Sequence, residues 1–362
     1  MKKPTIYLFC RQKRVARWRL VARQKRIGKK QNNQIFKSTN NGIVIKSPNV
    51  IGILKNAKAV VDFIKKISYF VLIRKAAVSL DFRWVEALYP EGTILLFSEI
   101  DRIVSLSEIN KPITIINPRI GRQREVLKQI GLLEITGDTC NVQPRRSDVV
   151  YWKSTKGANQ SGENLAILEA VAEQANKENA DRLAKNTIWR GVTEAVANSV
   201  EHAYLYPREV DNFQGLEESR WWMFTQLIDD SFTVTVCDLG CGYKSTIKKT
   251  IPEEFIDTLI SIFVEKRLKN PDASAIFTAM EYGRSGTKKT ERGKGSRDAL
   301  SVVTRHGSGY LFVISNTGWV RFEKNGSADV TTHGALDVNI NGTILFWKLP
   351  LANKTVRNND VN

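Results

Sequence analysis

Apolar positions between residues 41 and 150 follow two periods in turn. Short apolar runs, typical of buried strands, alternate with longer segments in which apolar residues recur every three or four positions, as on one face of a helix. The predicted strands cover residues 42–46, 76–82 and 112–117, and the predicted helices cover residues 57–73, 92–104 and 122–132. This alternation predicts an α/β domain over residues 41–150, and its sequence contains no catalytic cluster.

The rest of the chain has a second pattern of helices and strands. Residues 151–162 are polar and contain glycine, so we interpret them as a linker. Beyond them, the pattern predicts helices over residues 163–175, 189–204, 253–267, 272–282 and 297–306, and strands over residues 221–228, 231–236, 309–316, 318–322 and 342–350. Asp229 and Asp230 separate the first two strands, which indicates a hairpin. We expect a second domain over residues 163–352 and a tail over residues 353–362.

The helix predicted over residues 189–204 carries a polar stripe. Glu194, Asn198 and His202 recur every four residues, so in a helix they share one face. An amide oxygen is a hard ligand for Mg²⁺, and a carboxylate can accept a proton from a water or hydroxyl nucleophile. The stripe suits a site for a hydrated divalent cation, but taken alone it also fits the exposed face of a surface helix. His202 fits a phosphate contact and a packing role equally well.

A second motif follows the second strand of the predicted hairpin. Asp238 stands at the end of this strand, and Gly240 and Gly242 follow at alternate positions. Glycines let the backbone approach a flat ligand closely because no Cβ intervenes. A fixed carboxylate here can accept a hydrogen bond from the exocyclic amine of adenine, although Asp-x-Gly-x-Gly is also a common turn.

A third motif is the cationic, glycine-rich segment 283–296, which leads into a predicted helix. Free backbone amides and the helix dipole at such a junction favour an anion. Arg284, Lys288 or Lys294 can add positive charge. The segment fits a polyphosphate cradle and, by itself, fits a surface loop equally well.

Taken in order, these motifs resemble the ATP-binding domain of the GHKL superfamily, named for gyrase, the heat-shock chaperone, histidine kinases and the mismatch-repair protein. The matching residues are, in chain order, Glu194-x-x-x-Asn198, Asp238-x-Gly240-x-Gly242, Gly293-x-Gly295 and Gly342-Thr343. The version around Glu194 and Asn198 looks most like the serine kinases that act as anti-sigma factors. The resemblance covers about residues 160–350, and it implies a two-layer α/β sandwich of the Bergerat type with a mixed sheet.

This resemblance implies roles for individual residues in one Mg-ATP site. Asn198 would ligate Mg²⁺, Glu194 would act as general base, and Asp238 would bind adenine. Gly293 and Gly295 would line the phosphates. The other residues expected to contact the nucleotide are His202, Gly240, Gly242, Lys288, Lys294 and Thr343.

The chain departs from the GHKL pattern at two points, and these bear on turnover more than on binding. Ser296 stands where the family usually has leucine, and the lid over residues 245–292 is long. The expected function is a Mg-ATP-binding regulatory protein with ATPase or serine/threonine protein kinase activity. One alternative is a scaffold that binds nucleotide without hydrolysis. Another is a nucleic-acid-binding effector that uses ATP as a conformational switch, for instance in a bacterial defence module.

The first domain carries a weaker resemblance. Residues 78–82, 90–96 and 124–132 resemble parts of the STAS domains of anti-sigma-factor antagonists, which implies an α/β domain that docks a protein partner. In that family a serine or threonine just before the glycine is the phosphorylation switch. Here Glu91 precedes Gly92, which argues against a phosphoswitch.

Composition adds an excess of positive charge at one end of the chain. Lys and Arg number 55 against 37 Asp and Glu, a formal net charge of +18, and no acidic residue precedes Asp62. In the basic arm over residues 1–40, Trp18 stands among arginines, which suits phosphate contact and base stacking on nucleic acid. An anionic membrane surface fits nearly as well, and a solvated tail or an organelle transit peptide are the alternatives. We favour nucleic acid.

Cysteine spacing argues against a zinc-binding protein, and hydropathy argues against a membrane-spanning protein. Cys10, Cys140, Cys237 and Cys241 lack the spacing of a zinc site and fit reduced thiols in a cytoplasmic protein. No apolar run approaches the roughly 18–20 residues of a membrane span. We therefore expect a cytoplasmic protein with ATP and Mg²⁺ as cofactors, and the sequence leaves a homodimer open.

Overall fold

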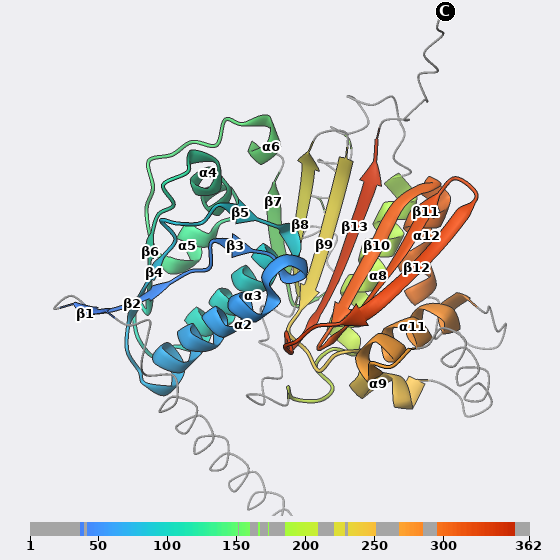
Figure 1. Cartoon of the computed structure of the whole chain (residues 1–362), viewed down its shortest axis with the longest axis horizontal. Coiled ribbons are helices and arrows are strands. Elements are labelled where there is room, and N and C mark those ends of the chain that lie inside the picture. Colours follow the sequence, from blue (N-terminus) through green and yellow to red (C-terminus); the bar gives the residue numbers. More distant parts are fainter. Residues whose placement is uncertain are drawn as a thin grey trace, which may run out of the picture.

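The computed structural model describes residues 37–39, 42–150, 152–159, 166, 173, 185–208, 221–228, 231–250, 268–284 and 295–351. Several predictions lie outside these residues: most of the basic arm, nearly all of the helix over residues 163–175, the Asp229-Asp230 turn, the helix over residues 253–267, and the loop with Lys288, Gly293 and Lys294. Figure 1 shows two α/β units side by side, each built on its own main sheet.

The first unit has a four-stranded sheet in the order β1-β2-β4-β6. Its strands are β1 (Lys37–Thr39), β2 (Gly42–Lys46), β4 (Val78–Asp81) and β6 (Ile113–Ile116). Strands β2, β4 and β6 are parallel, whereas β1 is antiparallel to β2. Parallel neighbours need crossover connections, and the helices predicted between these strands supply them. This confirms the prediction of an α/β class.

Helices of the first unit contribute apolar side chains to a core that they share with this sheet. They are α2 (Ile53–Ser68), extended by a π-helical turn (Tyr69–Ile73), α3 (Pro90–Leu106), α4 (Gly121–Gln129), α5 (Leu132–Thr136) and α6 (Ser147–Val150). Short strands β3 (Val50–Ile51) and β5 (Ala87–Leu88) pair with each other. At the start of α3, Glu91 is only 4% exposed, and a Cβ on Gly92 would lie 2.5 Å from the backbone of Gly52. Glu91, which the proposed resemblance places at the phosphorylation switch of STAS domains, is therefore a buried carboxylate.

The second unit has a seven-stranded sheet in the order β12-β11-β10-β13-β9-β8-β7. Its strands are β7 (Lys153–Gly157), β8 (Trp221–Ile228), β9 (Ser231–Asp238), β10 (Ser308–Ser315), β11 (Gly318–Asn325), β12 (Ala328–Ala335) and β13 (Thr343–Pro350). All described neighbours in this sheet are antiparallel, so the prediction of a mixed sheet is wrong. Consecutive strands pair directly in β8–β9 and in β10–β11–β12, and β13 then inserts between β9 and β10.

Both faces of the seven-stranded sheet are covered. On one face lie α8 (Lys185–Glu201), α9 (Tyr243–Thr250), α11 (Pro271–Arg284) and α12 (Gly295–His306). Alternate strand residues such as Val236 and Leu345 share an apolar core with these helices. Trp222 and Phe224 on β8 and Phe346 on β13 point to the opposite face of the sheet. There they join the core of the first unit, where α3 packs on the sheet. The two-layer prediction therefore misses a third layer, which the first unit supplies.

The segment expected to be a linker is part of this sheet. Strand β7 pairs with β8 from Lys153 opposite Thr225 to Gly157 opposite Trp221. In addition, the Ser154 hydroxyl donates a hydrogen bond to the Ile130 carbonyl at 2.8 Å. Residues 153–157 thus form an edge strand that bridges the two units, which corrects the linker assignment for these residues.

Buried charged groups connect α3 to the second unit. The Glu99 carboxylate lies 2.7 Å from the Arg102 guanidinium and 2.6 Å from that of Arg208. Two residues after Glu99, Asp101 accepts a hydrogen bond from the Trp222 indole at 2.9 Å and lies 2.8 Å from the Lys156 ammonium. Since all but Lys156 are nearly inaccessible, these groups satisfy one another within a largely apolar interface.

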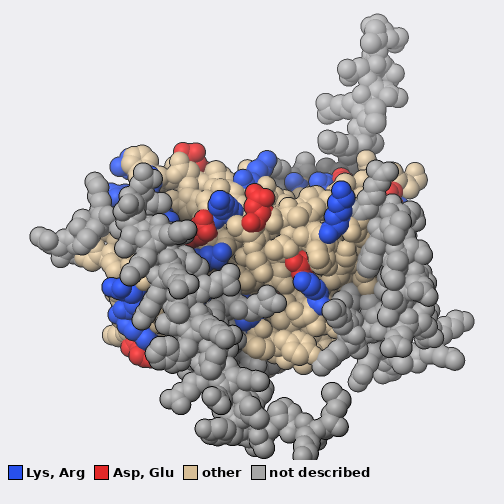
Figure 2. Space-filling view, turned by 60° about the horizontal axis from the view of Figure 1, so that its bottom comes forward, with Lys and Arg blue, Asp and Glu red and all other residues tan. Residues whose placement is uncertain are grey.

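Two features of the described residues concern possible partners: the hydropathy of the helices and the charge on the surface. Among the described residues, no helix has both the length and the apolar character needed to cross a membrane. Figure 2 shows cationic and acidic side chains interspersed on one face of the molecule, several of them adjacent to each other. This distribution fits the near-neutral composition of the chain beyond residue 62.

Candidate functional site

Helix α8 presents the polar stripe beside the start of α12. A Cβ on Gly191 would lie 2.3 Å from a methyl carbon of Val302, so glycine allows the two helices to approach closely. At this contact the Arg190 guanidinium lies 3.2 Å from the Asp298 carboxylate. Burial, followed by the negative charges of Asp298 and Glu201, raises the pKa of Glu194. Glu194 is thus a half-buried carboxylate with increased affinity for a proton.

Asp238 ends β9 with a buried carboxylate that is 5% exposed. One of its oxygens accepts a hydrogen bond from the Gly240 N–H at 2.9 Å, and the other lies 3.5 Å from the Ser199 hydroxyl of α8. Burial raises the pKa of Asp238 to about 7, although hydrogen bonds from Gly240, Ser199 and Thr343 oppose this shift. Asp238 therefore contacts α8, its own loop and β13.

Strand β13 brings the predicted Gly342-Thr343 pair to the same place. Thr343 stands opposite Asp238 in the β9–β13 register. A Cβ on Gly342 would lie 2.3 Å from the Asp238 carbonyl oxygen, so a larger residue would force these strands apart. The Thr343 hydroxyl lies 3.4 Å from that of Ser315 on β10. The structure thus places Thr343 beside Asp238, as the order of motifs suggests.

The glycine loop after β9 rests on the chain that leaves α8. The Cys241 N–H donates to the Ala203 carbonyl at 2.8 Å, and a Cβ on Gly240 would lie 2.2 Å from that carbonyl oxygen. Gly242 has a φ of +79°, in the region that favours glycine. Both glycines therefore have a structural reason in the close contact between this loop and the end of α8.

The remaining predicted site residues divide into those the structure describes and those it does not. Asn198 is half-buried on α8. His202 is half-buried too, but α8 ends at Glu201, short of the predicted residue 204, so His202 follows the helix, with its ring 3.9 Å from the Glu201 carboxylate. Gly295 is the first residue of α12. Lys288, Gly293 and Lys294 lie outside the described residues. The phosphate end of the site therefore stays a prediction, whereas the α8, β9 and β13 motifs are brought together.

The residues present are compatible with an adenine nucleotide and one metal ion. Asp238 offers a carboxylate held in place by Ser199 and Thr343, as hydrogen bonding to an adenine amine requires. No cluster of three or more His, Cys, Asp or Glu side chains suited to a metal occurs in the described part of the chain. A Mg²⁺ ion would therefore take most of its ligands from phosphate oxygens and water, with the Asn198 amide as the predicted protein ligand.

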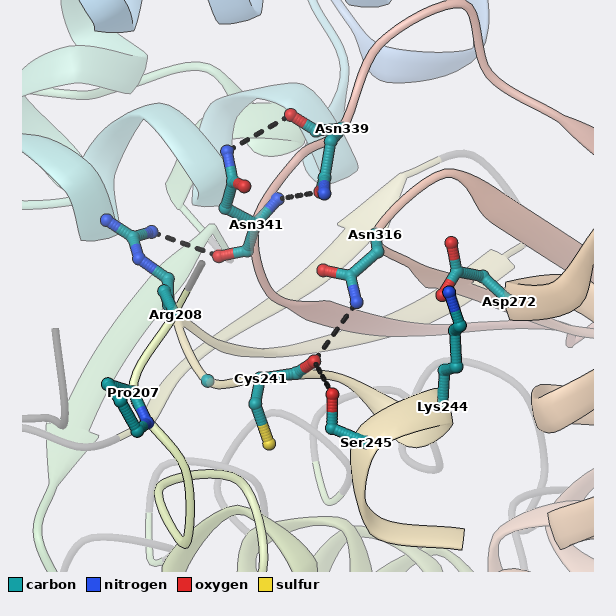
Figure 3. A pocket seen from close by; sticks show the side chains of 10 residues that line it. Pro207, Arg208, Cys241, Lys244, Ser245, Asp272, Asn316, Asn339 and Asn341 are labelled. Carbon is teal, nitrogen blue, oxygen red and sulfur yellow. Dashed lines mark hydrogen bonds between the residues drawn. The ribbon is translucent and has the colours of Figure 1, made fainter. Parts of the chain in front are cut away.

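A cavity of about 250 Å³ lies next to the glycine loop. Figure 3 shows its polar lining, in which the Asn316 amide and the Ser245 hydroxyl donate to the Cys241 carbonyl at 3.1 and 3.2 Å. The lining residues are Pro207, Arg208, Gly240, Cys241, Lys244, Ser245, Asp272, Asn316, Asn339 and Asn341. Of the predicted site residues that the structure describes, only Gly240 lines this cavity; Asp238, Thr343 and the α8 stripe do not.

Sequence reasoning missed several residues that support the site. Ser199 was not among the predicted site residues, yet its hydroxyl lies 3.5 Å from the Asp238 carboxylate and also donates to the Ala195 carbonyl at 3.0 Å. The Tyr204 hydroxyl accepts the Leu239 N–H at 3.0 Å, directly after Asp238. The sequence signal for Ser199 was a hydroxyl residue among small apolar residues on α8. No sequence feature near Tyr204 indicated its contact with the loop after β9.

Comparison with known proteins adds no assignment. The chain matches no family model, and comparison with curated proteins and with solved structures found no match.

Proposed function

We propose that the protein is a Mg-ATP-binding regulatory protein whose nucleotide site lies between α8, the loop after β9 and the start of β13. The observation that carries this proposal is the buried Asp238 carboxylate, held between Ser199, Gly240 and Thr343 from three separate segments. Burying a carboxylate costs free energy of folding, so a carboxylate buried at a glycine loop suits a binding role.

Adenine recognition follows from this arrangement. The carboxylate accepts the exocyclic amine, and the glycine loop lets the base approach the backbone because no Cβ intervenes at Gly240 and Gly242. Guanine presents a carbonyl oxygen in place of this amine, so the ionised Asp238 would repel it. The site therefore selects adenine over guanine nucleotides.

The α8 stripe would serve the phosphate end of the nucleotide. Mg²⁺, when bound, neutralises charge on the phosphates, and the Asn198 amide would hold it. Glu194 orients a water or hydroxyl and accepts its proton, because its raised pKa increases its proton affinity. An attacking water makes the protein an ATPase, whereas an attacking protein hydroxyl makes it a serine/threonine kinase.

The regulatory part of the proposal rests on the first unit. Its α3 is buried against the nucleotide-binding unit, and Arg208 connects α3 to the loop that precedes Thr343. A STAS-like unit in this position would couple a docked protein partner to the adenine end of the site.

Calorimetry with Mg-ATP and Mg-GTP tests the first step. We expect saturable heat with ATP and at least tenfold weaker binding of GTP. Asp238→Asn should weaken ATP binding, whereas Asp138→Asn, which changes a carboxylate that accepts the Ile115 N–H in the first unit, should not. Absence of saturable ATP binding by the wild-type protein would refute the proposal.

A further inference from the structure

The parallel strands of the first unit end at one edge of their sheet, and this edge carries cations around an exposed tryptophan. Lys46 is the last residue of β2, Trp84 follows β4, and Arg119 follows β6. Because β2, β4 and β6 run in the same direction, their carboxyl ends meet at this edge. Ligands of α/β proteins often bind at this end of a sheet.

Trp84 lies against the Arg119 guanidinium, with the Lys46 ammonium farther away. Its side chain is 44% exposed, and the Arg119 guanidinium lies 3.9 Å from the ring centroid, with the Lys46 ammonium at 5.9 Å. The Arg119 N–H also donates to the Arg83 carbonyl at 3.3 Å, which ties the two loops together. The indole is therefore oriented by the protein while nearly half of its surface stays open to solvent.

The charge at this edge is only partly compensated. Arg83 makes hydrogen bonds of 2.9 and 2.8 Å to the two oxygens of Asp81, so it is neutralised and fixed. Within the described part of the chain, neither Lys46 nor Arg119 forms an ion pair with a carboxylate. An anion bound here would pair with these two cations without displacing an existing salt bridge.

The start of α4 adds to the same surface. This nine-residue helix begins at Gly121, two residues after Arg119, with no side-chain cap and no acidic residue in its first turn. Its first backbone N–H groups are therefore free of a protein acceptor side chain, and the dipole favours negative charge. The Arg146 guanidinium is also close, since a Cβ on Gly121 would lie 3.8 Å from it, but it is already paired with the Glu125 carboxylate at 3.3 Å.

We propose that this edge, formed by Lys46, Trp84, Arg119 and the start of α4, binds single-stranded nucleic acid. A base stacks on the exposed indole, and flanking phosphates contact Lys46, Arg119 and the α4 amides. An acidic peptide would use the cations but not the oriented ring, and a membrane would require a wider apolar face than Trp84 and Ile120 provide. The residues of this site belong to the first unit, and none of them is part of the basic arm or of the proposed nucleotide site.

Fluorescence anisotropy with labelled oligo-dT and oligo-rU tests this proposal on the full chain. Trp84→Ala should weaken binding about tenfold, since stacking of one base contributes about 1–3 kcal/mol, and Trp84→Phe should retain most of the affinity. Arg119→Gln should weaken binding and make it less sensitive to salt. Lys75→Gln is the matched control, because Lys75 is an exposed cation of the same unit already paired with Glu108 at 2.8 Å.

Two further readouts separate this surface from its rivals. Photo-crosslinking of a bromouracil-containing oligonucleotide should label the peptide that contains Trp84 in the wild-type protein. Crosslinks confined to residues 1–36, or equal affinities for Trp84→Ala, Arg119→Gln and the control, would overturn the proposal. So would a Trp84→Ala variant that loses binding to anionic phosphatidylserine vesicles but keeps full oligonucleotide affinity. Trp84 is exposed, so unchanged thermal melting should confirm that the variants fold.

Discussion

The Arg208 guanidinium lies 2.6 Å from the Glu99 carboxylate, and the two side chains are only 2% and 5% exposed. The same Arg208 nitrogen donates to the Asn341 carbonyl at 3.0 Å, next to Gly342 and Thr343. One buried side chain therefore joins α3 of the first unit to the segment that positions Thr343 beside Asp238. Through this contact, a change in the docking of α3 can reach the adenine end of the proposed site.

Breaking this pair should destabilise the protein strongly. Arg208→Met leaves the Glu99 charge buried with one fewer partner, and loss of one member of a buried pair typically costs about 3–5 kcal/mol. We expect urea denaturation to show a loss of this order. Lys75→Gln, which removes one partner of the exposed Lys75–Glu108 pair, should leave the midpoint almost unchanged. Similar midpoints for the two variants would contradict a buried role for Arg208.

Replacement of Glu194 should separate turnover from binding. Glu194→Gln keeps the shape of the side chain but cannot accept a proton, so hydrolysis or phosphoryl transfer should fall by about 10²–10⁴-fold. The ATP affinity measured by calorimetry should stay within a few-fold of wild type. Glu201→Gln, which changes an exposed carboxylate at the end of the same helix, should retain turnover. A fully active Glu194→Gln variant would rule out the proposed general base.

The raised pKa of Asp238 should make stability depend on pH. In the unfolded chain this carboxyl loses its proton near its ordinary value of 3.8, whereas in the folded protein it does so at about 7. Between these values the folded state binds more protons, so its contribution to stability falls as pH rises from about 4 to about 7 and is constant above. Wild type and Asp238→Asn should therefore diverge by a few kcal/mol across this window, in favour of the variant at high pH.

Thermal melting of both proteins from pH 4 to pH 9 measures this difference. The other titrating groups are common to the two proteins, so subtraction isolates Asp238. A constant difference at all pH values would show that Asp238 titrates normally. ATP affinity should change in the opposite direction and rise up to about pH 7, because the ionised carboxylate is the better acceptor for the adenine amine.

The contact between the glycine loop and the end of α8 should tolerate no side chain. Gly240→Ala places a Cβ 2.2 Å from the Ala203 carbonyl oxygen, which is backbone and cannot swing away. We expect a loss of stability on the order of 1–3 kcal/mol, as for overpacked sites, together with weaker ATP binding. Gly121→Ala is the control, because its Cβ would meet no atom closer than 3.8 Å. Calorimetric melting measures the stability of both variants. If Gly240→Ala were as stable as the control, the predicted steric conflict with Ala203 would be wrong.

Local sequence signals predicted the elements of the fold better than their assembly. Periodicity found β2, α2, β8 and α12 because each buries one apolar face or run. It missed β12, whose sequence Ala-Asp-Val-Thr-Thr-His-Gly-Ala is polar and mostly exposed at a sheet edge. It also interpreted β7 as a linker, because Lys153–Gly157 holds its place through backbone pairing with β8 and not through apolar side chains.

The candidate site was predictable where chemistry and glycine spacing coincide. Asp238, Gly240 and Thr343 lie together because β9 and β13 are neighbours, and the order of motifs anticipated this. Ser199 was not predicted as a partner of Asp238, since that contact depends on how α8 docks on the sheet. The buried charges of α3 were equally hidden, because Glu99, Asp101 and Arg102 have the sequence appearance of a solvated face.

The shared role of α3 limits how the molecule can be divided. If residues 152–351 were produced alone, α3 would no longer cover Trp222, Phe224 and Phe346. Arg208 would lose its partner Glu99 and would lie beside this exposed apolar surface. Such a fragment would tend to self-associate through this apolar surface, so it would be a poor sample for testing the proposed ATP site. Dissection of this protein is therefore better done with point substitutions than with truncations.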